Sequence, residues 1–185
     1  MKIGMSLEIA ELKEKNLSNG PEWPSHPFSG QYCLYWEFPK GCLDPKKEKK
    51  EEMREKKLNW LRETRMVFGN CGMIAYLNEK PVGYAQYAPP EFLPQAFSYP
   101  IKPSKDAVLL SCLFIPQKEY RRLGIGREIL KRIIADLEKR KVKALEAFAR
   151  KGKEENPSGP VEFYLRNGFR IYKDDKEFPL LKLDL

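Results

Sequence analysis

Tyr120-Arg121-Arg122-Leu123-Gly124-Ile125-Gly126-Arg127 stands between an apolar run, residues 107–115, and a helical pattern that ends near Arg140. Because they lack side chains, Gly124 and Gly126 let the backbone turn tightly and approach a ligand closely. The first amides of the following helix have no internal acceptor, and the helix dipole makes that end positive. The corner therefore suits a phosphate or diphosphate group, with the arginines of the stretch able to reach the same anion.

Two well-known phosphate motifs do not match this corner. No Gly-Lys-Ser/Thr follows it, as the Walker loop requires. The dinucleotide fingerprint needs a third glycine and an acidic residue at the end of the next strand, and it is also absent. Paired glycines also serve as plain punctuation between a loop and a helix. The choice between the two interpretations rests on the elements around the corner.

The corner lies inside a predicted strand–helix–strand unit. Residues 107–115 (AVLLSCLFI) are apolar on both faces, which is typical of a central strand. A broad apolar face marks the helix that follows, formed by Ile129, Leu130, Ile133, Ile134 and Leu137. Residues 142–149 form a second near-continuous buried strand. Such a unit is a crossover connection, so the two strands are predicted to be parallel neighbours.

The flanking segments predict further strands. A hairpin precedes the unit, with strands at 73–77 and 82–87. After the break Asn156-Pro157-Ser158-Gly159-Pro160, a short helix at 161–167 ends at Gly168. Two strands, at 169–172 and 178–185, close the chain.

The N-terminal third predicts a strand, a loop and a second strand. Residues 5–12 alternate as in a strand with one exposed face. Residues 16–30 form a proline-containing loop that holds His26, the only histidine. The aromatic run 32–38 is predicted to be a strand in which Glu37 faces either solvent or a ligand pocket.

A charged helix is predicted next. Asp44-Pro45 provides an N-cap and a first helical proline. Residues 46–57 are almost wholly charged, so this half is expected to project into solvent rather than bury a face. Acidic residues are interspersed among the basic ones, and no aromatic residue is. This pattern disfavours a nucleic-acid-binding arm.

Composition limits the class of protein. The 185 residues, 42% of them hydrophobic, are enough for one domain with a substantial core. No apolar run approaches the ~20 residues that span a bilayer, and residues 1–5 lack a signal peptide's apolar core. A cytoplasmic protein without a membrane segment is predicted. The net charge of +8 fits an anionic cofactor, an acidic substrate or nucleic acid.

The cysteines are scattered and form no Cys-x-x-Cys pair, which favours buried thiols over disulfides. No metal is predicted. A zinc site remains an alternative that the spacing supports poorly; its ligands would be Cys33, Cys42, Cys71 and His26.

Two motifs together suggest a family. Arg121-Arg122-Leu123-Gly124-Ile125-Gly126 matches Gln/Arg-x-x-Gly-x-Gly/Ala, and Phe163-Tyr164-Leu165-Arg166-Asn167-Gly168-Phe169 matches Tyr-x-x-x-Gly-Phe. In this order and about forty residues apart, they make the chain resemble the GNAT superfamily of acyl-CoA N-acyltransferases. The resemblance covers residues 72–185 well and the N-terminal third loosely.

The resemblance implies an α/β (α+β) fold, with a mixed, strongly twisted central sheet of about six to seven strands and flanking helices. One domain is expected over residues 1–185. Residues 1–71 would be its variable, acceptor-side part with a charged helix at about 45–68, and residues 72–185 would hold the acetyl-CoA site.

The resemblance also implies where acetyl-CoA, the acyl donor, would bind. Backbone groups of Leu113, Phe114 and Ile115 would pair with the pantetheine arm, and one of their amides would face the thioester oxygen. Tyr164 would lie near the sulfur as the general acid for the departing thiolate, unless it is only a core aromatic. The remaining cofactor contacts would be Arg121, Arg122, Leu123, Gly124, Ile125, Gly126, Arg127, Asn156 and Ser158.

The implied reaction is acetyl transfer to a primary amine by direct attack in a ternary complex. The acceptor ammonium must first lose a proton, and Glu37 and Glu91 are the candidate bases. A covalent route through Cys112 lacks a nearby histidine in the sequence to activate the thiol. Alternatives are a CoA-binding regulator without catalysis and a basic nucleic-acid-binding protein.

Two departures from the family pattern leave the acceptor open. The link 116–119 between the predicted strand and the glycine corner is slightly longer than the usual link in the family. The N-terminal part has a proline-rich loop and the Tyr35-Trp36-Glu37 segment where many members have two helices. The connection 89–103, which carries Phe92, Phe97 and Tyr99, is expected to form a wall of the acceptor site. The oligomeric state, monomer or homodimer, is also open.

Overall fold

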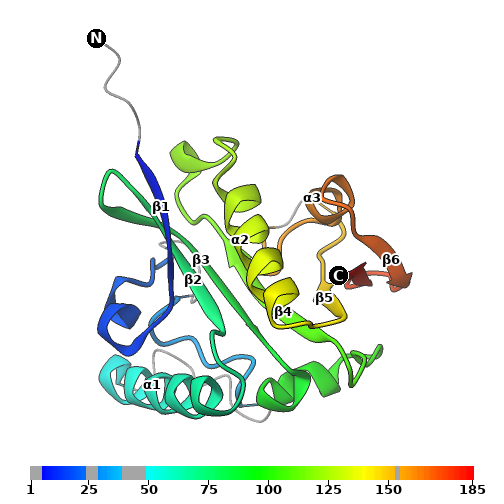
Figure 1. Cartoon of the computed structure of the whole chain (residues 1–185), viewed down its shortest axis with the longest axis horizontal. Coiled ribbons are helices and arrows are strands. Elements are labelled where there is room, and N and C mark those ends of the chain that lie inside the picture. The colour runs from blue at the N-terminus through cyan, green and yellow to red at the C-terminus, as the bar shows by residue number, and fades with distance from the viewer. Residues whose placement is uncertain (1–5, 24–28, 39–48, 153–154) are drawn as a thin grey trace.

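The computed structural model contains a mixed sheet of seven strands in the order β1-β2-β3-β4-β5-β7-β6 (Figure 1). It describes residues 6–23, 29–38, 49–152 and 155–185, and these counts refer to that part of the chain. The strands are β1 (Leu7–Glu11), β2 (Gly72–Leu77), β3 (Lys80–Ala88), β4 (Val108–Phe114), β5 (Ala144–Phe148), β6 (Arg170–Lys173) and β7 (Leu180–Asp184). This confirms the predicted fold class.

The predicted hairpin and crossover unit are both confirmed. β2 and β3 are antiparallel, and the turn between them places Asn78 and Glu79 at positive φ, as a two-residue hairpin turn requires. β4 and β5 are parallel and are connected through α2 (Ile125–Lys139). The other strand pairs are antiparallel.

The two parallel strands separate soon after they meet. β4 pairs with β5 only at Val108 with Leu145 and at Leu109 with Glu146. On its other side, β4 stays paired to β3 as far as Phe114, with one extra residue, Ser111, between the pairs. The backbone of β4 beyond Leu109 therefore faces a gap instead of a β5 partner.

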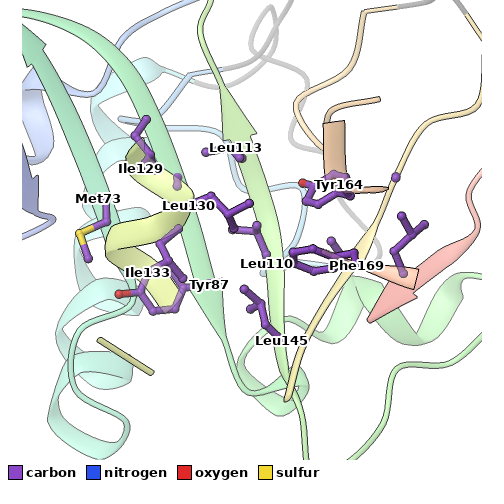
Figure 2. Packing of buried hydrophobic residues seen from close by; sticks show 14 of the residues in the cluster. Met73, Tyr87, Leu110, Leu113, Ile129, Leu130, Ile133, Leu145, Tyr164 and Phe169 are labelled. Atoms are coloured by element: carbon purple, nitrogen blue, oxygen red, sulfur yellow. The ribbon is translucent and has the colours of Figure 1, made fainter. Parts of the chain in front are cut away.

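Helices cover both faces of the sheet. α2 and α3 (Val161–Arg166) lie on one face, where α2 packs against β1, β2 and β3. Figure 1 shows α2 over the middle of the sheet. Figure 2 shows Ile129, Leu130 and Ile133 of α2 among residues of the strands such as Met73 and Tyr87. The apolar helix face predicted from the sequence thus forms the core.

The other face carries α1 (Lys50–Val67) and the loops around it. Three tryptophans, Trp23, Trp36 and Trp60, are buried there. Short 3-10 helices complete the chain at Glu14–Asn19, Pro90–Phe92, Pro94–Ser98 and Lys118–Tyr120. No helix in the described ranges is both long enough and apolar enough to cross a membrane.

Two predictions for the N-terminal third are wrong. Residues 32–38 form turns rather than a strand, with local bonds such as that from the Phe38 amide to the Leu34 carbonyl, 3.2 Å. The aromatic side chains are buried by packing over the face of the sheet, so the segment needs no strand partner. The charged half of the helix does bury a face, because Met53 and Lys57 are only 2% and 3% exposed. The predicted N-cap Asp44-Pro45 lies outside the described residues.

Candidate active site

The glycine corner forms an open N-terminus for α2. Gly124 has φ +84°, a left-handed conformation that favours glycine, and its carbonyl accepts the amide of Glu128 at 3.1 Å. A Cβ added at Gly124 would meet nothing within 4 Å, so the space above the corner is open. The first amides of α2 point into this space without partners in the helix. Arg122 and Arg127 are exposed beside it.

Arg121 is used differently from its two neighbours. Its Nε donates to the Ile115 carbonyl at 2.8 Å and its guanidinium also donates to the Pro116 carbonyl at 2.9 Å. It forms an ion pair with Glu155 and lies over the ring of Trp23 at 5.3 Å. Arg121 thus ties the corner to the end of β4, and Arg122 and Arg127 are the guanidinium groups of the stretch that face solvent.

The gap beside β4 is partly closed by the loop that follows β5. The Leu113 amide donates to the Pro157 carbonyl at 2.8 Å, so Leu113 faces the gap. Because backbone groups alternate along a strand, Phe114, which pairs with Tyr84, faces β3. If the alternation continues for one more residue, the backbone groups of Ile115 face the gap again.

Tyr164 is fully buried at the edge of this gap, near Leu110, Leu113 and Phe169 (Figure 2). Its hydroxyl donates to the Ser158 carbonyl at 2.6 Å. Desolvation by burial raises the pKa of Tyr164 far above the usual range, so the hydroxyl stays protonated. The loop is held in turn by the side chain of Asn156, whose Oδ1 accepts the Ser158 amide at 2.8 Å.

A cavity of about 170 Å³ lies beside Asn156, Pro157 and Ser158. It brings the predicted cofactor loop together with β4 and with the N-terminal third. Its remaining lining residues are Ser29, Cys33, Tyr35, Trp36, Tyr99, Cys112, Phe114 and Phe178. Of the aromatic residues expected as an acceptor wall, Tyr99 lines the cavity, whereas Phe97 is 44% exposed. Tyr35 and Trp36 belong to the segment named for the acceptor side, whereas Cys33 and Phe178 were not predicted there, because aromatic residues and cysteines are ordinary core residues in a sequence.

Glu37 is not among the residues that line this cavity. Its carboxylate forms an ion pair with Lys57, and the side chains of the pair are 2% and 3% exposed. Gln86 Nε2 donates to Glu37 Oε1 at 2.9 Å, and Tyr84 donates to Gln86 Oε1 at 2.9 Å. Glu37 Oε2 is buried without a hydrogen-bond partner among the described residues. Glu91, the other candidate base, is exposed.

The two buried thiols, those of Cys71 and Cys112, are not poised as nucleophiles. Desolvation by burial raises the pKa of Cys71 to about 12 and that of Cys112 above this range. Within the described part of the chain, no three His, Cys, Asp or Glu residues are grouped to hold a metal ion. His26 and Cys42, two of the four residues in the zinc alternative, lie outside that part.

The site thus consists of a parallel strand pair that opens beside a helix N-terminus, with a cavity next to the gap. The model of the family described as "Acetyltransferase (GNAT) family" matches residues 30–169, and the chain belongs to this family of acetyltransferases. The resemblance noted from the two motifs is thereby confirmed. None of the curated protein sequences compared with the chain matches it.

Solved structures share the fold over nearly the whole chain. A PaiA N-acetyltransferase from Thermoplasma acidophilum, in complex with coenzyme A, is 15% identical, with 97% of this chain and 99% of that chain covered and a TM-score of 0.60. A ribosomal-protein-alanine N-acetyltransferase from Brucella melitensis is 18% identical, with 96% and 99% covered and a TM-score of 0.59. Arabidopsis thaliana Naa50, in complex with the bisubstrate analogue CoA-Ac-MVNAL, is 15% identical, with 97% and 99% covered and a TM-score of 0.57.

Proposed function

We propose that this protein transfers an acetyl group from acetyl-CoA to a primary amine by direct attack within a ternary complex. The observation that carries the proposal is the open N-terminus of α2 next to a gap between two parallel strands, with the Tyr164 hydroxyl at the edge of that gap. Family membership supports the acetyl transfer, and the geometry supports the roles of the residues.

The corner would bind the diphosphate of coenzyme A. The amides at the start of α2 would donate to its oxygens, and the exposed Arg122 and Arg127 would neutralise its charge. Leu123, Gly124, Ile125 and Gly126 would contribute backbone contacts. Arg121 would support this site by holding the corner against β4.

The edge of β4 would bind the pantetheine arm and the thioester. Leu113 and Ile115 face the gap, but the Leu113 amide already donates to Pro157. The amide of Ile115 is therefore the better candidate to stabilise the oxyanion, unless the thioester oxygen displaces the Pro157 carbonyl. Such a donor typically contributes about 3–4 kcal/mol to the transition state. The loop residues Asn156 and Ser158 would complete this side of the site.

Tyr164 would act on the leaving thiolate. A simple thiol has a pKa of about 8.5, and burial raises the pKa of Tyr164 well above that value. Complete proton transfer from Tyr164 is therefore uphill. The hydroxyl would first stabilise the thiolate by donating a hydrogen bond, after leaving its present acceptor, the Ser158 carbonyl. It would act as a general acid only when the proton released by the attacking amine reaches Tyr164 and replaces the one that the hydroxyl gives to the thiolate.

The proton of the acceptor ammonium would leave through Glu37. Direct abstraction is not supported, because Glu37 does not line the cavity. Its Oε2, buried without a hydrogen-bond partner among the residues that the structure describes, is instead suited to a water that relays the proton. Residues 1–71 would then form the acceptor-side part of one domain spanning residues 1–185, because Tyr35 and Trp36 line the cavity from that part.

The test is an amine-panel screen that follows thiol release from acetyl-CoA, beside a reaction without acceptor. Under this proposal Tyr164→Phe lowers kcat by about 10²–10⁴-fold, the usual contribution of a positioned acid, and leaves the Kd of CoA nearly unchanged. An unchanged kcat would remove the role of Tyr164. Tight binding of CoA without transfer to any amine would favour the CoA-binding regulator instead.

A further inference from the structure

The cavity beside the gap has the composition of a binding site for one aromatic ring. Five of its eleven lining residues are aromatic: Tyr35, Trp36, Tyr99, Phe114 and Phe178. None of its lining residues, which all belong to the described part of the chain, is Lys, Arg, Asp, Glu or His. Its described walls thus offer apolar and aromatic surface but no opposite charge for a charged substituent.

The rings of one wall are parallel and are held in place. Trp36 and Tyr99 stack at 5.6 Å between centroids with 10° between their planes, and Tyr99 stacks on Phe148 at 4.5 Å with 20°. The hydroxyls of Tyr35 and Tyr99 are hydrogen-bonded at 3.0 Å. Such a preformed wall binds a flat ring at little cost in conformational entropy.

The cavity also has the right size and position. Its volume of about 170 Å³ is close to that of an apolar cavity, about 150 Å³, that is known to bind benzene. Its lining includes Cys112 and Phe114 of β4 and Ser158 of the loop, whose carbonyl accepts the Tyr164 hydroxyl beside the proposed thioester site. An amine joined to the ring by a short linker would therefore reach the proposed thioester site.

We propose that the acceptor is a primary amine carrying a single aromatic ring on a short uncharged linker. This inference rests on the proposed function and names the substrate class for the same site. A polyamine or a free amino acid would bring a second charge into a cavity whose described lining cannot pair it, and that desolvation is costly. A peptide with an aromatic N-terminal residue is the rival acceptor, and the experiment separates the two.

The experiment compares kcat/KM for five amines with saturating acetyl-CoA. Phenethylamine is the expected acceptor. Phenylalanine adds only a carboxylate to it, cyclohexylethylamine replaces only its ring, spermidine tests a polycation, and a Phe-Ala amide dipeptide tests a peptide N-terminus. We expect kcat/KM for phenethylamine to exceed that for each of the others by about tenfold or more, from ring stacking and from the absence of an unpaired charge.

A matched pair of variants locates the binding site. Cys33 is half-buried in the cavity wall, so Cys33→Leu fills the space and should lower kcat/KM for phenethylamine by about tenfold or more, with the Kd of CoA unchanged. Glu63→Leu adds the same side chain on the exposed face of α1, away from the cavity, and should leave kcat/KM unchanged.

The outcomes distinguish this inference from the function on which it rests. Preference for any of the other four amines, or an unaffected Cys33→Leu variant, overturns the substrate class while acetyl transfer stands. If CoA binds and no amine is acetylated, the proposed function falls. Quenching of tryptophan fluorescence by phenethylamine in the CoA-loaded protein then decides: saturable quenching lost in Cys33→Leu supports an aromatic-amine site, and no quenching overturns that too.

Discussion

Replacing Lys57 by methionine should cost the fold several kcal/mol and should loosen the aromatic wall of the cavity. Lys57 lies on α1 with its side chain 3% exposed, and its ammonium contacts both Glu37 and Gln86. It also lies 4.9 Å from the ring of Trp60. Methionine keeps most of the length and volume of lysine but leaves the Glu37 carboxylate buried without its cation.

The expected magnitude follows from that burial. Removing one partner of a buried ion pair costs about 3–5 kcal/mol, a large part of the roughly 5–15 kcal/mol that stabilises an ordinary protein. At about 2–4 °C per kcal/mol for a chain of this size, Tm should fall by roughly 6–20 °C. The double variant Lys57→Met/Glu37→Gln should recover on the order of 2 kcal/mol, because no buried charge is left uncompensated.

The assay is urea unfolding at pH 7 followed by tryptophan fluorescence, with Lys131→Met as the control. Lys131 pairs with Glu128 at 2.8 Å, but their side chains are 56% and 47% exposed, so this variant should lose less than about 1 kcal/mol. If Lys57→Met loses no more than the control, or if the double variant shows no coupling, the ion pair does not hold residues 29–38 against α1. Other contacts would then hold the aromatic residues of the cavity wall in place.

Three further predictions concern the corner, the thiol and pH. Gly124→Ala should destabilise the fold by about 1–2 kcal/mol because of its positive φ, whereas Gly126→Ala should stabilise it by roughly 0.5 kcal/mol, since its Cβ meets Phe163 at an ordinary 3.5 Å. Both should weaken CoA binding in calorimetry, and an unaffected Kd would count against the diphosphate site. Cys112→Ala should lower kcat less than about tenfold if attack is direct; complete loss of activity in a folded variant would favour the covalent route. The third prediction concerns the buried acidic groups Cys71, Cys112, Tyr84, Tyr87 and Tyr164, because burial raises the pKa of each in the folded state above its unfolded value. Their contribution to stability is fully present below the unfolded pKa, so the free energy of unfolding measured in urea should fall as pH rises above about 9, by up to about 1.4 kcal/mol per pH unit for each group. A flat profile to about pH 11 would refute their burial.

Most of the central sheet could be predicted from the sequence. The apolar run of β4, the 3.6-residue period of α2 and the hairpin turn at Asn78 and Glu79 are local signals, because the structure they specify is completed within a few residues. The glycine corner belongs to the same class, since positive φ at Gly124 depends on that residue's own lack of a side chain. Its place between two parallel strands then followed from the order of the elements.

The candidate site depended on contacts that local patterns do not contain. Lys57 is one lysine in a charged run, and only packing against Glu37, twenty residues earlier, and Gln86, twenty-nine residues later, makes it a buried partner. The same packing buries residues 32–38 without a strand. The cavity is assembled from residues as far apart as Ser29 and Phe178. The sequence by itself determined most strands and helices of residues 72–185 and the glycine corner, because short-range backbone preferences specify them. Only the tertiary structure decided which charges are paired and where an acceptor fits, because both depend on distances between residues far apart in the chain.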